Sequence, residues 1–126
     1  MRCFLPALIV IALSVTGLNA QMAQGLVTGA DWVKACQEPQ PGKPLNDPLV
    51  IARSGYCVGF ITGVFMTNGM AKQMNGKQLI CIPPAITVDD ARKIFLKFMK
   101  DHPERAQEPG PGLLLASLAL AFPCAR

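Results

Sequence analysis

Four of the five cysteines constrain the fold of this chain more than any other feature: Cys36, Cys57, Cys81 and Cys124. The fifth, Cys3, lies in the N-terminal segment that we expect to be removed on export. An even number of cysteines in a short exported chain is typical of a disulfide framework, which compensates for a small hydrophobic core. A zinc site instead uses closely paired cysteines or several histidines, whereas these cysteines are widely spaced and His102 is the only histidine. The pattern therefore predicts two disulfides, and no metal ion or other cofactor.

Export is indicated by the first twenty residues. Arg2 precedes an apolar stretch over residues 3–15, and small and polar residues then lead to Ala20, which is the layout of a secretory signal peptide. A membrane anchor is the alternative, but the apolar stretch is shorter than the roughly 20 residues that cross a bilayer. We therefore expect cleavage to remove residues 1–20 and to leave one domain, residues 21–126, that is not bound to a membrane.

The charge of the chain bears on nucleic-acid binding. The formal net charge is +4, and no run of basic residues is longer than two. Proteins that bind nucleic acid present a basic patch, often with aromatic side chains on which bases stack. The sequence has no such combination, so we expect no nucleic-acid partner.

Two helices are predicted in the first half of the mature chain. Thr28 and Asp31 have the spacing of a capping box, which opens a short helix before a proline-rich loop over residues 38–48. Asp47, followed by a proline, is a favourable start for a long second helix. We expect that helix to end at residues 75–76, an Asn-Gly pair, because glycine readily adopts the left-handed conformation that terminates helices.

Two more helices are predicted in the second half. Thr87 and Asp90 form another capping box, which opens an amphipathic helix over residues 88–101. The Pro-Gly-Pro-Gly segment at residues 109–112 is expected to extend the preceding loop, so that the last helix covers only residues 113–121. This helix is apolar on nearly all sides, and we expect it to be buried. The predicted fold is an all-α, four-helix domain stapled by disulfides.

An up-and-down arrangement of these helices would bring the cysteines together in pairs. Cys36 ends the first helix and Cys57 lies in the early turns of the second, so both fall near one end of the bundle. Cys81 precedes the third helix and Cys124 follows an antiparallel fourth helix, so these two also share an end. We expect the pairs Cys36–Cys57 and Cys81–Cys124, although four cysteines allow three arrangements and the sequence leaves the choice open.

The long helix carries two stripes of unusual composition. Three glycines recur at every fourth position: Gly55, Gly59 and Gly63. Three methionines follow with the same spacing: Met66, Met70 and Met74. Each glycine costs about 1 kcal/mol relative to alanine in a helix, so close helix packing is expected to compensate, either within the chain or across a dimer. The thioethers could bind Cu(I), but methionine stripes more often pack, and the two stripes together could form a dimer seam.

Few residues offer catalytic chemistry. Histidine is the side chain most often used for acid–base catalysis near neutral pH, but His102 stands at a predicted helix end, where histidine often hydrogen-bonds the last carbonyl groups. Asp89 and Asp90 form a carboxylate pair, yet acidic residues also favour the first turn of a helix. No nucleophile has a base near it in the sequence. We therefore expect a binding protein rather than an enzyme.

Several short motifs occur in the order of a known family. They are the segment 55–64 around Cys57 and Gly59, Cys81-Ile82-Pro83, His102-Pro103-Glu104, and the segment 119–124 that ends in Phe-Pro-Cys. Over residues 32–124 the chain resembles the Rap/Tai family of periplasmic immunity proteins, which act against amidase effectors of the type VI secretion system. The resemblance implies an all-helical fold, a periplasmic location, disulfides, and a homodimer that binds and blocks a peptidoglycan-cleaving amidase.

The polar loop over residues 101–112 is the expected contact with the amidase, because loops held by a rigid scaffold often carry binding functions. Four of its side chains are candidates: Glu104, Arg105, Gln107 and Glu108. The alternative for this loop is a solvated connector. The alternative for the whole protein is a periplasmic acid-stress chaperone or another envelope stress factor, which would lose its dimer and expose apolar surface in acid.

Overall fold

The computed structural model describes residues 27–37 and 46–125. The expected signal peptide and most of the expected loop at 38–48 lie outside these residues. Four α-helices and one 3-10 helix form the described part: α2 (Gly29–Cys36), α3 (Pro48–Asn75), α4 (Val88–Asp101), η1 (Pro103–Arg105) and α5 (Gly110–Ala121). This part contains no β-strand, only an isolated bridge between Thr28 and Pro109. The expected all-α, four-helix fold is confirmed.

Capping boxes start α2 and α4, as the sequence predicts. At α2, the Asp31 amide donates to Thr28 Oγ1 at 3.3 Å, and the Thr28 amide donates to the Asp31 carboxylate at 3.1 Å. The corresponding distances between Thr87 and Asp90 at α4 are 3.1 and 2.9 Å. Each pair satisfies two backbone N–H groups that the first turn of a helix leaves without a partner.

The long helix α3 also begins and ends where the sequence predicts. Asp47 accepts a hydrogen bond from the Leu49 amide at 2.9 Å, and Pro48 occupies the first turn, where its missing N–H costs nothing. Gly76 ends the helix in the left-handed conformation, with φ of 69°. A residue with a Cβ atom would be strained there.

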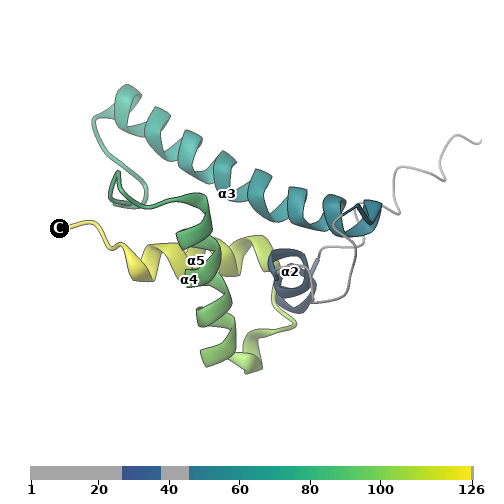
Figure 1. Cartoon of the computed structure of the whole chain (residues 1–126). Coiled ribbons are helices and arrows are strands. Elements are labelled where there is room, and N and C mark those ends of the chain that lie inside the picture. The colour runs from purple at the N-terminus through teal and green to yellow at the C-terminus, as the bar shows by residue number, and fades with distance from the viewer. Residues whose placement is uncertain (1–26, 38–45, 126) are drawn as a thin grey trace, which may run out of the picture.

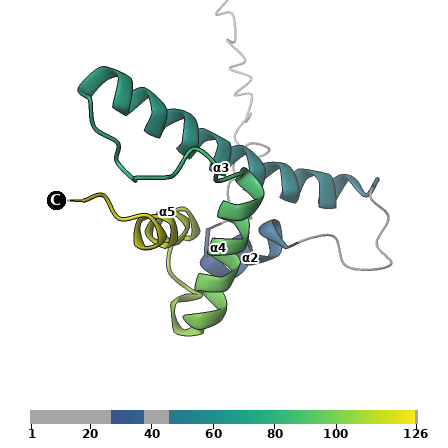
Figure 2. The ribbon, with the colours of Figure 1, turned by 60° about the vertical axis from the view of Figure 1, so that its left-hand side comes forward.

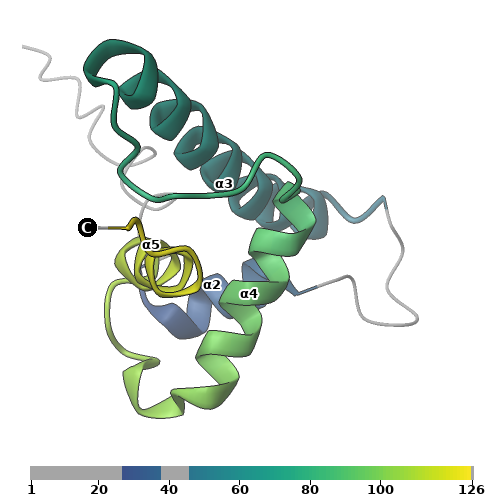
Figure 3. The same cartoon turned by 90° about the vertical axis from the view of Figure 1, so that its left-hand side faces the viewer.

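The helices cross one another instead of running up and down. In Figure 1, α3 lies along one side of the domain, and α4 and α5 cross below it. Figure 3 shows α5 end-on while α4 runs across the view, so these two helices are not antiparallel. The expected up-and-down topology is therefore wrong, because the wide α4–α5 turn redirects the chain. The core between the helices is formed by fully buried side chains, chiefly Ile61, Phe95, Leu113, Leu114 and Leu118.

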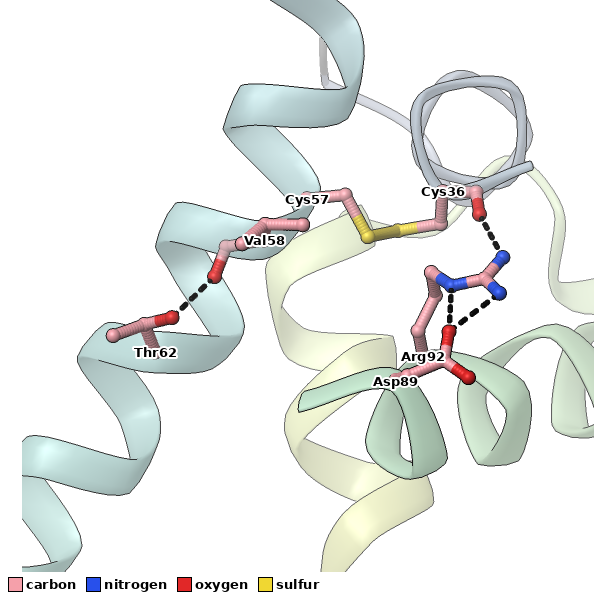
Figure 4. Close-up of a disulfide and its surroundings, with 6 residues drawn as sticks. All are labelled: Cys36, Cys57, Val58, Thr62, Asp89 and Arg92. Atoms are coloured by element: carbon pink, nitrogen blue, oxygen red, sulfur yellow. Dashed lines mark hydrogen bonds and ion pairs between the residues drawn. A yellow bond between two sulfur atoms is a disulfide. The ribbon is translucent and has the colours of Figure 1, made fainter. Parts of the chain in front are cut away.

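Both disulfides have the expected pairing despite the different topology. Cys36–Cys57 joins the end of α2 to α3, and Cys81–Cys124 joins the connector before α4 to the segment after α5. Arg92 of α4 reinforces the first disulfide, since its Nη1 donates to the Cys36 carbonyl at 2.9 Å while its Nη2 lies 2.6 Å from Asp89 (Figure 4). The three helices α2, α3 and α4 are thus held together at one point.

A buried asparagine fixes the connector between α3 and α4, which runs back along α3 (Figure 2). Asn68 is buried in α3, and its Oδ1 accepts hydrogen bonds from the amides of Leu79 at 2.9 Å and Ile80 at 3.0 Å. Its Nδ2 donates to the Ile80 carbonyl at 2.7 Å. A buried amide with these bonds meets its polar requirements, and it positions Cys81 for its disulfide.

The last helix differs from the prediction in two ways. It begins at Gly110 instead of residue 113, because a proline is tolerated in the first turn and Pro111 falls there. The expectation that residues 109–112 shorten this helix is therefore wrong. The helix is also not buried on all sides, since Leu115 and Leu120 are exposed, Leu120 by 68%. One apolar face of α5 is left open beside α3.

Candidate protein-binding surfaces

The α4–α5 loop, residues 102–109, is the first candidate surface. Its backbone is bonded to the start of α2: the Gly29 amide donates to the Glu108 carbonyl at 2.8 Å, and the Ala30 amide donates to the Ala106 carbonyl at 2.9 Å. The Gly110 amide donates in return to the Val27 carbonyl at 3.0 Å. The loop therefore satisfies the free N–H groups of α2, and its backbone is held in place while most of its side chains face solvent.

Ion pairs and ring contacts order the side chains of this loop. Arg105 makes a bidentate pair with Glu108, with Nε–Oε1 and Nη2–Oε2 distances of 2.9 and 2.7 Å. This hydrogen bonding raises the pKa of Arg105 and lowers the pKa of Glu108. The Arg105 guanidinium also lies 5.4 Å from the centre of the Phe98 ring, on which His102 packs at 4.7 Å.

Of the four expected contact residues, three are exposed and one is partly covered. Glu104, Gln107 and Glu108 are exposed, whereas Arg105 is partly buried between Glu108 and Phe98. The mutual pairing of Arg105 and Glu108 neutralises their charges, which leaves Glu104 and Gln107 as the exposed side chains outside this pair. Glu104 Oε1 lies 3.2 Å from His102 Nδ1, so it also has a local partner.

A second candidate surface, the α3–α5 groove, was not predicted. It is an apolar depression of about 740 Å³ lined by Gly59, Gly63, Val64, Leu79, Leu115 and Ala119, among others. A Cβ atom built on Gly59 or Gly63 would meet nothing within 4 Å. Within the described residues, the glycine stripe is therefore not packed against another helix. The stripe itself was the sequence signal for this groove, but the chain folds in a way that leaves it open.

The methionine stripe is also open to solvent. Met66, Met70 and Met74 are exposed by 66, 59 and 77%. Such a row of exposed thioethers beside an apolar groove extends the apolar surface along most of α3. Large exposed apolar patches on a folded domain mark sites of association.

The length and composition of α3 are enough for a membrane span, and only 11% of its most apolar window is buried. Its disulfide to Cys36 nevertheless ties it to α2 and α4. A spanning α3 would draw the Arg92–Asp89 pair toward lipid, and charges in hydrocarbon are costly. We therefore treat α3 as a helix on the surface of the domain.

The residues weighed as catalytic have structural partners. Asp89 pairs with Arg92 and Lys93, and Asp90 caps α4; these hydrogen bonds lower the pKa of both carboxyl groups. His102 is the C-cap residue of α4, and its backbone amide donates to the Phe98 carbonyl at 3.0 Å. In the described stretches 27–37 and 46–125, no three His, Cys, Asp or Glu side chains form a group that could hold a metal ion.

A family comparison identifies the domain. The family model described as Rap1a immunity proteins matches residues 28–124, from the N-cap of α2 to the last cysteine. The chain belongs to the Rap1a immunity protein family. Comparisons with curated proteins and with solved structures gave no match. Family membership makes the chain an immunity protein directed against a secreted effector, and it implies a protein partner.

Proposed function

We propose that this Rap1a family protein is a periplasmic immunity protein, exported by a cleaved signal peptide, that binds and occludes a peptidoglycan amidase delivered by type VI secretion. The observation that carries the proposal is the α4–α5 loop, whose backbone is bonded to α2 while Glu104 and Gln107 face solvent. A loop that is ordered before binding loses little conformational entropy when it enters a cleft. Its exposed polar side chains would hydrogen-bond the walls of the amidase cleft, and no catalytic step is required of the immunity protein.

We also propose that the protein is a homodimer joined through the α3–α5 groove. The groove is apolar, and its glycines leave room for the backbone of another helix. The exposed methionines beside it are unbranched and adapt to the shape of a partner surface. A second copy of α3 would bury both features and would offset the cost of glycine in the helix.

The direct test is complex formation with an exported amidase, which is sought among the products of the adjacent genes and is called the neighbouring amidase below. The oxidised mature protein and that amidase are mixed and separated by size-exclusion chromatography. A stoichiometric complex is expected. If the two proteins elute separately at micromolar concentration, the proposed function is wrong.

The exposed apolar surface also suits the alternative, an acid-stress chaperone, because such a protein binds the apolar segments of unfolded clients. The pKa values of the carboxyl groups indicate that these groups take up protons only at low pH. All those with a shifted pKa, Asp31, Asp89, Asp90, Asp101 and Glu108, have it lowered. A dimer that stays intact at pH 3 and binds no hydrophobic dye would exclude this alternative.

A further inference from the structure

A second groove lies between α2 and α4, and the function proposed above does not use it. It has a volume of about 670 Å³ and an apolar floor formed by Val33, Leu96, Met99 and Ala106. Two lysines, Lys34 of α2 and Lys100 of α4, stand at its edges. We call this depression the α2–α4 groove.

The sequence periodicity explains why the groove forms. Its lining residues follow the spacing i, i+3 and i+4 from Ala30 on α2 and i, i+3 and i+4 from Leu96 on α4, and Gln37 and Pro103, just beyond the ends of the two helices, also line it. Residues with this spacing lie on one face of a helix. The two helices turn these faces toward the same depression, and apolar side chains of both helices line its floor.

The two lysines at the groove each lie near one carboxylate, Lys34 near Asp31 and Lys100 near Asp101, but neither forms an ion pair with it. The neighbouring lysines of α4 are paired: Lys93 with Asp89 at 2.7 Å and Lys97 with Asp101 at 2.5 Å. Lys34 and Lys100, by contrast, are exposed and form no ion pair with any described residue. The acidic residue of α2, Asp31, is held in its capping box. The groove thus combines an apolar floor with two available positive charges.

We propose that the α2–α4 groove binds an acidic segment of the partner protein that carries apolar anchor residues, such as an amphipathic helix with leucines on one face and glutamates beside them. The apolar anchors would cover the floor, and the glutamates would pair with Lys34 and Lys100. Grooves between helices commonly take amphipathic helices in this way. The proposal rests on the proposed function, since it assigns a second contact to the same effector.

The position of the groove supports this occupant. Its lining includes Pro103 and Ala106, which belong to the α4–α5 loop. An effector that receives this loop in its cleft would bring its own surface over the adjoining groove. One continuous interface would then contain the rigid loop and the groove, and the basic edges would select an acidic surface near the cleft.

The test uses a synthetic peptide with repeated Leu-Leu-Glu-Glu sequence and a counterpart in which lysine replaces every glutamate. Binding to the oxidised mature protein is measured by fluorescence anisotropy, and the site is mapped by NMR of the methyl groups of Leu96, Met99 and Ala106. The acidic peptide should bind at these methyls and the basic one should not. The K34E/K100E variant should weaken binding about tenfold, whereas K72E/K77E, with the same change of charge at the far end of α3, should leave it unchanged.

The same two variants are then tested in the complex with the neighbouring amidase. If the complex forms and K34E/K100E weakens it more than K72E/K77E does, both proposals are supported. If it forms and the two variants behave alike, the groove proposal is wrong while the immunity function stands. If no complex forms but the acidic peptide binds at the groove, the proposed function fails and the groove remains a site for acidic segments. Equal binding of both peptides, no binding of the acidic one, or methyl shifts only at the α3–α5 groove would overturn the proposal.

Discussion

At the scale of single residues, Gly110 has the least room for a Cβ atom among the glycines in residues 27–37 and 46–125. A Cβ atom there would lie 2.0 Å from Cδ1 of the buried Trp32. We expect Gly110→Ala to lower the free energy of unfolding by about 1–3 kcal/mol, because the indole would have to move within a packed core. Urea denaturation measures this loss.

Gly112 provides the matched control, since it lies in the same turn of α5 and a Cβ atom there would meet nothing within 4 Å. Gly112→Ala should keep or raise the stability, by up to about 1 kcal/mol, because alanine favours the helix. Equal stability of the two variants would contradict the packing of Trp32 on α5.

The polar side chains of the α4–α5 loop are expected to act in binding and not in stability. The triple variant E104A/R105A/E108A removes an ion pair that is largely open to solvent, and such pairs contribute little to folding. Its melting temperature should stay within a few degrees of the wild type, while its affinity for the amidase falls about tenfold or more. Calorimetry and circular dichroism measure the two quantities. The control Q73A/K77A alters exposed residues away from the loop, and a triple variant with unchanged affinity would exclude this contact.

The two capping boxes make the stability depend on pH. Hydrogen bonds from Thr28 and Thr87 lower the pKa of Asp31 and of Asp90 from 3.8, the value of an unperturbed carboxyl group. A group with a lowered folded pKa adds stability that is complete above its unfolded pKa and is lost as the pH falls through the folded pKa. We expect the melting temperature to be level between pH 7 and about 5 and to fall below about pH 4.

The variant D31N/D90N checks the cause of this dependence. Its melting temperature at pH 7 should be lower than that of the wild type. On acidification its melting temperature should fall by less, because two of the titrating groups are gone. Circular dichroism melts from pH 7 to pH 2 give both curves. An identical slope for the two proteins would show that the capping boxes are not responsible.

At the scale of secondary-structure elements, the association of α3 can be tested through its glycines. Glutamate at positions 59 and 63 would place two charges in the apolar surface that the proposed dimer buries. The monomer should still fold, because a Cβ atom at either position would meet no other atom within 4 Å. We expect Gly59→Glu with Gly63→Glu to convert a dimer to a monomer with the same helix content. Sedimentation velocity and circular dichroism read out the two properties.

The control for the seam is Gly69→Glu with Gln73→Glu, which adds the same charge to the same helix outside the α3–α5 groove. This protein should remain a dimer. A wild-type protein that is monomeric at micromolar concentration, or a groove variant that stays dimeric, would contradict the proposed seam.

Local signals in the sequence were enough to place most helix ends. The capping boxes at Thr28 and Thr87, and the Asp47 and Gly76 ends of α3, depend on contacts between residues close in the chain. The start of α5 depends instead on a contact between residues far apart in the chain. Gly110 packs directly against Trp32, and the helix therefore begins at Gly110, with Pro111 in its first turn. That contact is visible only once the helices are packed.

The candidate surfaces were predictable to different degrees. The α4–α5 loop was found because it is polar and contiguous, and the glycine stripe pointed to close packing on α3. The open face of α5 was missed, because a helix that is apolar on all sides does not reveal which side remains in solvent. The α2–α4 groove was missed because Lys34 and Lys100 come together only through the crossing of two helices that are far apart in the chain.

At the scale of the whole molecule, two disulfides and a buried asparagine hold four crossing helices in one rigid body, with the α4–α5 loop anchored on α2. The disulfides close loops with sequence separations of 21 and 43. A disulfide that closes a loop of this size stabilises the folded state by roughly 3–4 kcal/mol. A domain of this size gains the stability that its small core does not supply. Rigidity of this kind suits a protein that works by occupying a cleft.

The measurement that tests this account most directly is the rate at which the neighbouring amidase cleaves purified peptidoglycan as the oxidised mature protein is added. Occlusion predicts that the cleavage rate falls linearly with added protein and reaches zero at a fixed stoichiometry. The E104A/R105A/E108A variant should inhibit the amidase only at a much higher concentration. A stable complex that cleaves peptidoglycan at the full rate would contradict occlusion.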